Sequence, residues 1–360
     1  MCGSVKPTVG SELLPDVVGM AVIGAGYWGP NLVRNVQAHP GMHLRWVCDR
    51  DLPKAQAVVG NSSTALASAN LAEVLADPAV TAVAIATPPS THLPVALAAF
   101  AARKHVLVEK PLAPSVRDGR RMVDAAERAG LVLMCDHTYC YTPAVTLIRN
   151  LVADGELGDI QYVDSVRIGL GLVQRDVDVL WDLAPHDLSI LDFVLPAHMA
   201  PTAVAAHTAD PLGAGRACIA YLTVALPERA IAHAHVNWLS PMKLRHTIFG
   251  GSKRILVWDD LHPTQRISVF DRGVDLADPG IGLEARREAL VSYRTGDMVA
   301  PALPEREALA AVMDEFASAV LESRRPATDG RAGLRVLAIL EAAARSAADG
   351  GMFVPLRSSS

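Results

Sequence analysis

Short apolar runs alternate with amphipathic stretches over the first 140 residues of the chain. Continuous apolar runs predict buried strands at 19–23, 44–48, 79–86, 105–108 and 131–135. Amphipathic stretches between them predict helices at about 30–38, from Ser90 or Thr91 to about 103, and at 115–129. This alternation of strand and helix predicts a doubly wound parallel sheet.

The pattern changes after residue 141. A helix is predicted at about 142–154 and a strand at 161–168; after another helical stretch come successive strands at 202–207, 217–226, 230–238, 244–249, 254–258 and 266–270. The turn Gly250-Gly251-Ser252 indicates a hairpin. Strands without intervening helices predict a mostly antiparallel sheet, followed by closing helices at 304–323 and 330–348.

The predicted fold class is therefore α/β followed by α+β. We divide the chain into a tail at 1–18, a doubly wound domain at 19–141 and an α+β domain at 142–360 with an open sheet. The C-terminal helix is expected to pack back on the first domain.

Composition narrows the class of protein. With 360 residues, 51% of them hydrophobic, the chain can bury more than one core, which favours two domains. The net charge of −5 offers no basic face for a nucleic acid, and no apolar stretch reaches the roughly 18 residues of a membrane span. Five cysteines without paired spacing indicate neither a disulfide framework nor a zinc site. We expect a cytoplasmic protein without nucleic-acid or membrane partners.

The first predicted strand leads into the segment Gly24-Ala25-Gly26-Tyr27-Trp28-Gly29, and a predicted helix follows it. In such a segment Gly24 permits a tight turn, Gly26 lets the backbone approach a pyrophosphate, and Gly29 lets the helix pack on the strand. The helix N-terminus offers N–H groups to phosphate. We therefore predict a dinucleotide site that includes the loop residues Tyr27 and Trp28.

The next strand ends in Asp49, twenty residues after the last glycine of the loop. A carboxylate there accepts hydrogen bonds from the adenosine ribose and repels a 2′-phosphate, which favours NAD(H). The neighbouring Arg50 can stack on adenine or hold a phosphate, so NADP(H) stays open. A turn of this shape that binds no dinucleotide is the alternative.

Two further strands end in polar residues at the carboxyl edge of the predicted sheet, where open α/β sheets bind ligands. The strand at 79–86 leads into Thr87, Pro88 and His92, which we expect to border the cofactor. The strand at 105–108 leads into Glu109-Lys110-Pro111. Pro111 favours an extended Lys110, which aims its ammonium at the site; a solvated surface lysine is the alternative.

The second half contains one chemical signal, Asp182 and His186. Four residues apart on a helix, they share one face, and a carboxylate near a histidine can orient it for proton transfer. A helix cap with an ordinary histidine is the alternative. His233 and His235 also share a face of a strand, but no third ligand accompanies them, so we predict no metal site.

These segments, together with Gly155-Glu156-Leu157-Gly158, resemble the glucose-fructose oxidoreductase, inositol dehydrogenase and rhizopine catabolism family, written Gfo/Idh/MocA, over residues 19–350. The resemblance implies an NAD(P)-dependent oxidoreductase with a Rossmann domain and a substrate-binding, oligomerising domain. It implies that Lys110 contacts nicotinamide and substrate, that His186 is the general acid/base and that Asp182 binds the sugar. Family precedent implies a homodimer or homotetramer.

Within the family, the segment 24–31, Asp136-His137-Thr138 and the segment 181–189 resemble the branch that acts at C3 of nucleotide-linked or amino sugars in polysaccharide or natural-product pathways. Further substrate-binding candidates are His137, Arg167, Gln174, Trp238 and Lys243, with a sugar stacked on Trp238 and a diphosphate near the cations. The alternatives are an inositol or cyclitol dehydrogenase, glycoside cleavage through a 3-ketosugar, and a regulatory protein that binds NAD(P) without catalysis.

Overall fold

The chain folds into two compact units. The computed structural model describes residues 17–60, 63–171, 173, 177–276 and 291–356. The first unit comprises the residues up to Ala113, Arg120–Asp136 and Val312–Gly330; the second comprises Pro114–Gly119, His137–Ala311 and the residues from Arg331 onward. None of the helices in the described part of the chain combines the length and apolar character that a membrane span requires.

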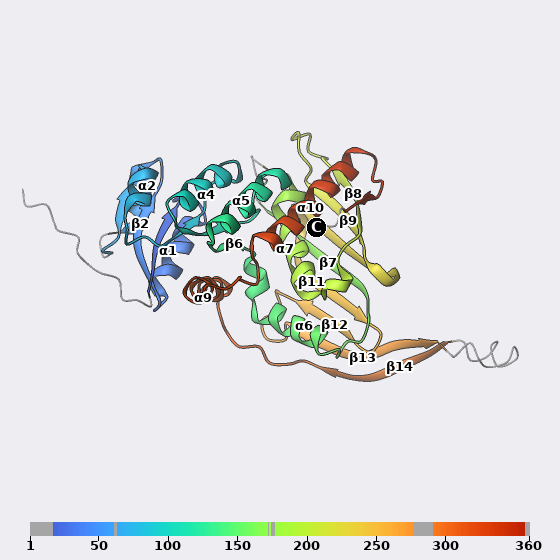
Figure 1. The fold of residues 1–360 in the computed structure, drawn as a ribbon. Coiled ribbons are helices and arrows are strands. Elements are labelled where there is room, and N and C mark those ends of the chain that lie inside the picture. Colours follow the sequence, from blue (N-terminus) through green and yellow to red (C-terminus); the bar gives the residue numbers. More distant parts are fainter. Residues whose placement is uncertain (1–16, 61–62, 172, 174–176, 277–290, 357–360) are drawn as a thin grey trace, which may run out of the picture. The chain divides into compact units, whose positions relative to one another are not determined.

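The first unit is built on a six-stranded parallel sheet in the order β3-β2-β1-β4-β5-β6. Figure 1 labels β2 and β6 of this sheet. The strands are β1 Val18–Ile23, β2 Met42–Cys48, β3 Leu66–Ser68, β4 Ala82–Ile85, β5 His105–Glu109 and β6 Leu133–Asp136. Every residue of β1, β4 and β6 is buried, as expected for strands covered on both faces. The strand order reverses between β1 and β4, and this reversal is where such sheets bind ligands.

Helices accompany these strands along the chain. They are α1 Gly29–Ala38, α2 Leu52–Val59, α3 Leu71–Ala76, α4 His92–Ala101 and α5 Val116–Ala129, the last of which belongs to this unit from Arg120 onward. The part of α9 (Ala308–Leu321) that follows Ala311 also belongs to this unit. A contact of 3.0 Å joins the carboxylate of its Asp314 to Nε2 of His39, directly after α1.

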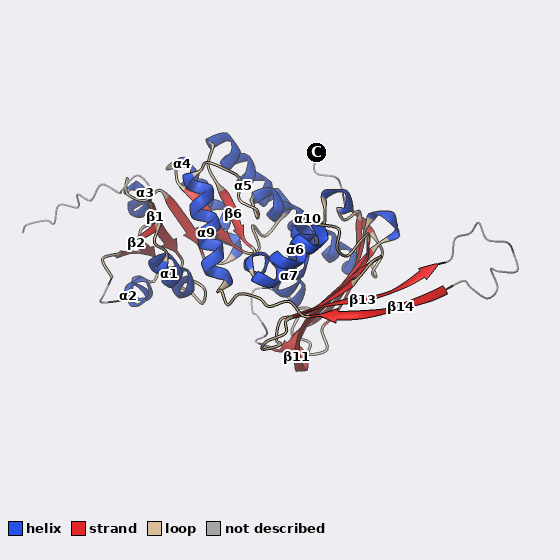
Figure 2. Cartoon of the chain, turned by 90° about the horizontal axis from the view of Figure 1, so that it is seen from below, coloured by secondary structure: helices blue, strands red, loops and turns tan. Residues whose placement is uncertain are grey.

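The second unit is built on a nine-stranded sheet in the order β14-β13-β12-β11-β7-β10-β9-β8-β15. The strands are β7 Ile160–Leu170, β8 Ala203–Ala209, β9 Ile219–Ala225, β10 Ile231–Asn237, β11 Leu239–Gly251, β12 Ile255–Asp259, β13 Ile267–Leu276, β14 Val291–Val299 and β15 Val354–Pro355. β7 and β10 run parallel, and the other pairs described are antiparallel. Figure 2 shows β13 and β14 as a ribbon that extends beyond the rest of this sheet.

The helices α6 Pro143–Ala153, α7 Val179–Val194 and α10 Gly330–Ala348 complete the second unit. Side chains alternate along β10, where Ala232, Ala234 and Val236 are buried on the face against which α7 packs. The predicted fold class, a doubly wound parallel sheet followed by a mostly antiparallel one, is confirmed.

Three strands were absent from the prediction: β3, β14 and β15. The part of α9 after Ala311 belongs to the first unit, and α10 belongs to the second unit apart from its first residue.

Candidate active site

The glycine loop after β1 has two glycines that the fold requires and one that it does not. Gly24 has a φ of +106°, and a Cβ there would lie 2.6 Å from the carbonyl oxygen of Ala86. A Cβ on Gly29 would collide with the carbonyl oxygen of Gly24. At Gly26, by contrast, a Cβ would meet nothing within 4 Å. The open space at Gly26 is therefore the place where a ligand can approach the backbone.

Asp49 is fixed beside this loop by backbone donors. Its Oδ2 accepts a hydrogen bond of 2.7 Å from the N–H of Ala25, and its Oδ1 accepts one of 2.9 Å from the N–H of Asp51. Each carboxylate oxygen has a further lone pair for a ribose hydroxyl. The adjacent Arg50 is exposed.

The same loop carries two exposed aromatic rings. Tyr27 is 86% exposed and Trp28 is 43% exposed, and their rings meet edge to face at 5.5 Å. Trp28 occupies the N-cap position of α1 and its side chain makes no capping hydrogen bond. Pro30 has no N–H, and the N–H of Asn31 donates to the carbonyl oxygen of Trp28 at 3.0 Å, so the N–H of Gly29 and the positive end of the helix dipole are what α1 can offer to a phosphate.

His92, predicted to border the cofactor, supports two loops of the site from within the protein. It is fully buried, with Nε2 2.8 Å from the carbonyl oxygen of Thr87 and Nδ1 3.1 Å from that of Pro111. Burial lowers the pKa of the imidazole. His92 therefore ties the loop after β4 to the loop after β5, while Thr87 and Pro88 stay partly or largely exposed.

Lys110 follows β5 and is partly exposed. The preceding Glu109 is buried and lies in register with Asp136, the last residue of β6. Burial, and next the nearby charge of Asp136, raise the pKa of Glu109, whereas the ammonium of Lys110 opposes this shift. The Lys110–Pro111 peptide is cis. The edge of the sheet thus carries a lysine beside two buried carboxyl groups.

In the second unit, α7 presents Asp182 and His186 one helical turn apart. The helix begins after Asp178, whose side chain accepts a hydrogen bond of 3.0 Å from the N–H of Trp181. Asp182 Oδ2 accepts a hydrogen bond of 3.2 Å from Nε1 of Trp238. Trp238 is only 3% exposed, so little of its ring is open for the predicted stacking of a sugar. The indole instead orients Asp182.

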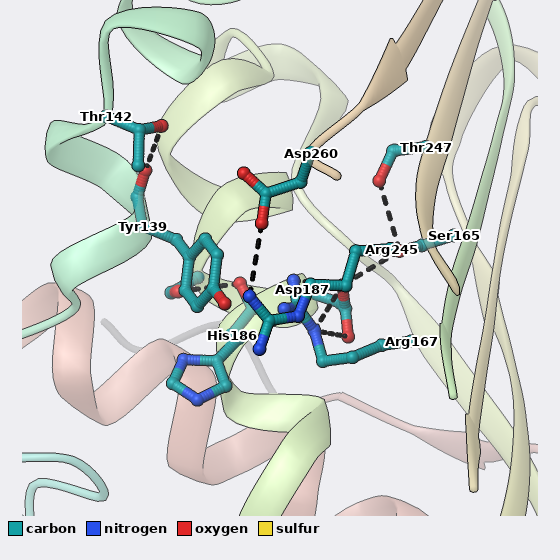
Figure 3. A network of polar contacts seen from close by, with 10 residues as sticks. Tyr139, Thr142, Ser165, Arg167, His186, Asp187, Arg245, Thr247 and Asp260 are labelled. Carbon is teal, nitrogen blue, oxygen red and sulfur yellow. Dashed lines mark hydrogen bonds and ion pairs between the residues drawn. The ribbon is translucent and has the colours of Figure 1, made fainter. Parts of the chain in front are cut away.

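Arg167, predicted as a substrate ligand, lies beside Asp187 in the structure (Figure 3). It is 6% exposed, and its Nε and Nη2 donate to the carboxylate of Asp187 at 3.0 Å each. Ser165 donates a further hydrogen bond of 2.8 Å to Asp187. A guanidinium that is buried and paired with a carboxylate in this way offers little surface to a substrate.

The sequence did not point to Tyr139, which lies in the short helix Thr138–Tyr141. Its ring meets the ring of His186 at a centroid distance of 4.9 Å and an angle of 64°. Cζ of Arg167 lies 4.3 Å from the centre of the same ring, and Cζ of Arg245 lies 5.8 Å from it. Arg245 is in turn paired with Asp260 at 3.3 Å.

The remaining predicted substrate residues have different positions. His137 is 1% exposed, Lys243 is exposed on β11, and Gln174 lies outside the described residues. On the sheet, His235 stacks on Tyr221 with 4.3 Å between ring centres. No group of three or more metal-ligating side chains lies together in the part of the chain that the structure describes.

Two models of known protein families match consecutive parts of the chain. The model described as "Oxidoreductase family, NAD-binding Rossmann fold" matches residues 18–137, and "Oxidoreductase family, C-terminal alpha/beta domain" matches residues 149–356.

Among curated relatives, the UDP-N-acetylglucosamine 3-dehydrogenase of Acidithiobacillus ferrooxidans is 29% identical over 263 residues, 72% of this chain and 76% of that protein. An uncharacterized oxidoreductase of Synechocystis, sll0816, is 33% identical over 144 residues, which are 40% of this chain and 39% of that protein. The match thus spans about two fifths of that relative, and 41% of an uncharacterized oxidoreductase of Streptococcus pneumoniae.

Two solved structures resemble the whole chain. GenD2 from gentamicin A biosynthesis, solved with NAD, has a TM-score of 0.79 at 27% identity and covers 99% of this chain and 100% of its own. The 3-dehydrogenase GnnA from Acidithiobacillus ferrooxidans has a TM-score of 0.75 at 26% identity and covers 91% and 96%.

Proposed function

Because the chain belongs to the Gfo/Idh/MocA oxidoreductase family and has its NAD-binding Rossmann fold, we propose that it is an NAD-dependent dehydrogenase or ketoreductase of a sugar. The observation that carries the proposal is the set of side chains on α7, where Asp182 is held by Trp238 and His186 lies one turn further along. A carboxylate and an imidazole on one helix face suit the binding of a hydroxyl and the transfer of its proton.

The residues of the first unit fit NAD. The open space at Gly26 admits a pyrophosphate, and the positive N-terminal end of α1 suits its charge. Asp49 has free lone pairs for the two ribose hydroxyls and repels a 2′-phosphate. We propose that Tyr27, Trp28 and Thr87 border the same ligand.

We propose that Lys110, Asp182 and His186 act on one substrate. Bound NAD supplies the acceptor or donor of hydride. His186 takes the proton of the reacting hydroxyl during oxidation and returns it during reduction. Lys110 stabilises the negative charge that develops on the same oxygen, and Asp182 accepts a hydrogen bond from the sugar.

The substrate we propose is a nucleotide sugar or aminosugar that reacts at C3 of its ring. Two relatives support this class: a UDP-N-acetylglucosamine 3-dehydrogenase and an enzyme of gentamicin A biosynthesis. A screen of nucleotide sugars and aminosugar intermediates with NAD and NADP, followed by absorbance at 340 nm and identification of the oxidised carbon, tests this choice. An inositol that outperforms every sugar in the screen would overturn it.

The role of Lys110 is tested by Lys110→Ala. We expect NAD to bind with an affinity close to that of the wild type and turnover to fall by about 10²- to 10⁴-fold, the usual cost of losing one such group. Lys54→Ala is the control, since Lys54 is an exposed lysine of the same unit that pairs with Asp51. Wild-type turnover in Lys110→Ala would contradict the assignment.

A further inference from the structure

Arg167 and Asp187, the residue that follows His186, form a buried ion pair that the proposed reaction does not explain. Arg167 and Asp187 have side chains that are 7% and 3% exposed, and the reaction proposed above uses neither of them. Burying two charges costs several kcal/mol per ion before their attraction is counted, so such a pair is weak evidence for stability alone. We propose that Arg167 is a positioning residue that sets the orientation of the His186 imidazole. The proposal rests on the function assigned to His186 above.

The first route runs through the backbone of α7. Asp187 directly follows His186, and it receives two parallel hydrogen bonds of 3.0 Å from Arg167. Ser165 adds a hydrogen bond of 2.8 Å to Asp187, and its hydroxyl lies 3.3 Å from that of Thr247. A planar guanidinium fork fixes both the distance and the angle of its carboxylate. The turn that carries His186 is therefore tied to β7.

The second route runs through the ring of Tyr139. Arg167 lies against this ring at 4.3 Å, a distance typical of a cation–π contact. The ring meets His186 at 4.9 Å and 64°, in the edge-to-face range that aromatic pairs prefer. One guanidinium thus acts on His186 from two sides: it holds the adjacent residue of the helix, and it holds the ring against which the imidazole packs (Figure 3).

Two further contacts limit the movement of Tyr139. Its ring centre lies 6.5 Å from that of Trp258, a buried residue of β12. Arg245 lies 5.8 Å from the ring and is paired with Asp260. Proton transfer requires the reacting atoms within about 3 Å of each other, and a misplacement of about 1 Å can cost on the order of 10²-fold in rate. Because the rate depends so strongly on the position of the imidazole, a buried ion pair that holds His186 in place can contribute to turnover.

The test replaces the ion pair without leaving a charge unpaired. In the double variant Arg167→Met/Asp187→Leu both partners become apolar, and such replacements of a buried pair are often neutral or stabilising. The control is Arg335→Met/Asp192→Leu, because Asp192 lies on the same helix and also receives two hydrogen bonds, of 2.6 and 2.8 Å, from one arginine. Arg167→Lys, which keeps the charge and loses the fork, is the milder variant.

The first readout needs no substrate. The full-length protein is labelled with ¹³C at Cε1 of its twelve histidines, and the His186 signal is assigned with His186→Asn. We expect the His186 signal to move in Arg167→Met/Asp187→Leu, although both rings are still present, and to stay in place in the control. A partial movement is expected in Arg167→Lys. An unmoved signal in a folded double variant would overturn the proposal; should that variant fail to fold, an unmoved signal in Arg167→Lys would do so.

The second readout is turnover with the sugar found in the screen. We expect the double variant to lose about 10- to 100-fold in kcat, while the Kd of NAD stays within about twofold of the wild type. Wild-type kcat in the double variant would overturn the positioning role. If no sugar is turned over by the wild type, the proposed function fails, and the histidine spectra still decide whether Arg167 orients His186.

Discussion

Gly26→Ala separates binding of the dinucleotide from stability of the loop. The structure leaves room for a Cβ at this position, with nothing within 4 Å, and its φ lies outside the left-handed range. The substitution is therefore expected to leave the free protein as stable as the wild type, or to stabilise it by up to about 1 kcal/mol through the unfolded chain. The added methyl group instead fills the space that we assign to the pyrophosphate.

The size of the effect follows from the cost of one extra methyl group at a packed contact. Overpacking typically costs about 1–3 kcal/mol, and about 1.4 kcal/mol corresponds to a factor of ten in affinity. We expect the Kd of NAD to rise by about 5- to 150-fold. Isothermal titration calorimetry of the wild type and the variant with NAD measures this change, and the melting temperature of the free proteins reports on stability.

Gly29→Ala is the matched comparison in the same loop. A Cβ there collides with the carbonyl oxygen of Gly24, so this variant should be destabilised before any ligand is added. If Gly26→Ala binds NAD as tightly as the wild type, the space at Gly26 does not hold the pyrophosphate. If Gly26→Ala lowers the melting temperature of the free protein as much as Gly29→Ala does, the fold requires a glycine at this position after all.

Three further substitutions test individual contacts. Asp49→Ser should narrow the preference for NAD over NADP by about tenfold or more, because it removes the carboxylate that repels a 2′-phosphate; the ratio of the two Kd values measures this. Glu109→Gln should gain stability relative to the wild type as pH rises above 4.5. Burial and Asp136 raise the pKa of Glu109 in the folded protein above its value in the unfolded chain. The wild type therefore loses stability as the pH rises between these two pKa values, whereas the glutamine variant does not. The difference in unfolding free energy between the two proteins, measured with denaturant, should be larger at pH 8 than at pH 5. Trp238→Phe should lower turnover several-fold with the Kd of NAD unchanged, since it removes the N–H that orients Asp182, and unchanged turnover would contradict that role.

Elements with continuous apolar runs were predictable from the sequence. The strand predicted at 105–108 is β5 His105–Glu109, and the helix predicted at 330–348 is α10 Gly330–Ala348. β14 was not predictable in this way, because Ser292, Arg294 and Asp297 interrupt its apolar pattern and its described side chains are largely exposed. It exists through its pairing with β13, where Arg294 bonds Asp271 across the ribbon at 3.0 Å. Pairing between distant segments leaves no local signal of this kind.

The candidate site residues that belong to a sequence motif were predictable, whereas contacts that arise only from tertiary packing were not. Strand ends and helical spacing are enough to select Lys110, Asp182 and His186 as candidates. Tyr139 reaches His186 only because the segment after β6 folds against α7, and no spacing in the sequence reports that contact. Arg167 offered one usable signal: it stands two residues after Ser165 on a strand, so both lie on one face, and a buried face with two polar residues requires a partner.

Burial separates the residues that face a ligand from those that hold them. His92, Arg167 and Trp238 were predicted as ligand contacts because polar and aromatic side chains near a site commonly bind something, yet each is at most 6% exposed. A buried polar group needs a partner within the protein, and the partners here belong to the predicted site: the indole N–H of Trp238 serves Asp182, and His92 serves the backbone next to Lys110. We therefore expect these three residues to support the proposed site from within the protein. A conservative change at such a support should lower kcat and leave the affinity for NAD close to that of the wild type. Gly26→Ala should instead weaken the binding of NAD and leave kcat at saturating NAD close to that of the wild type.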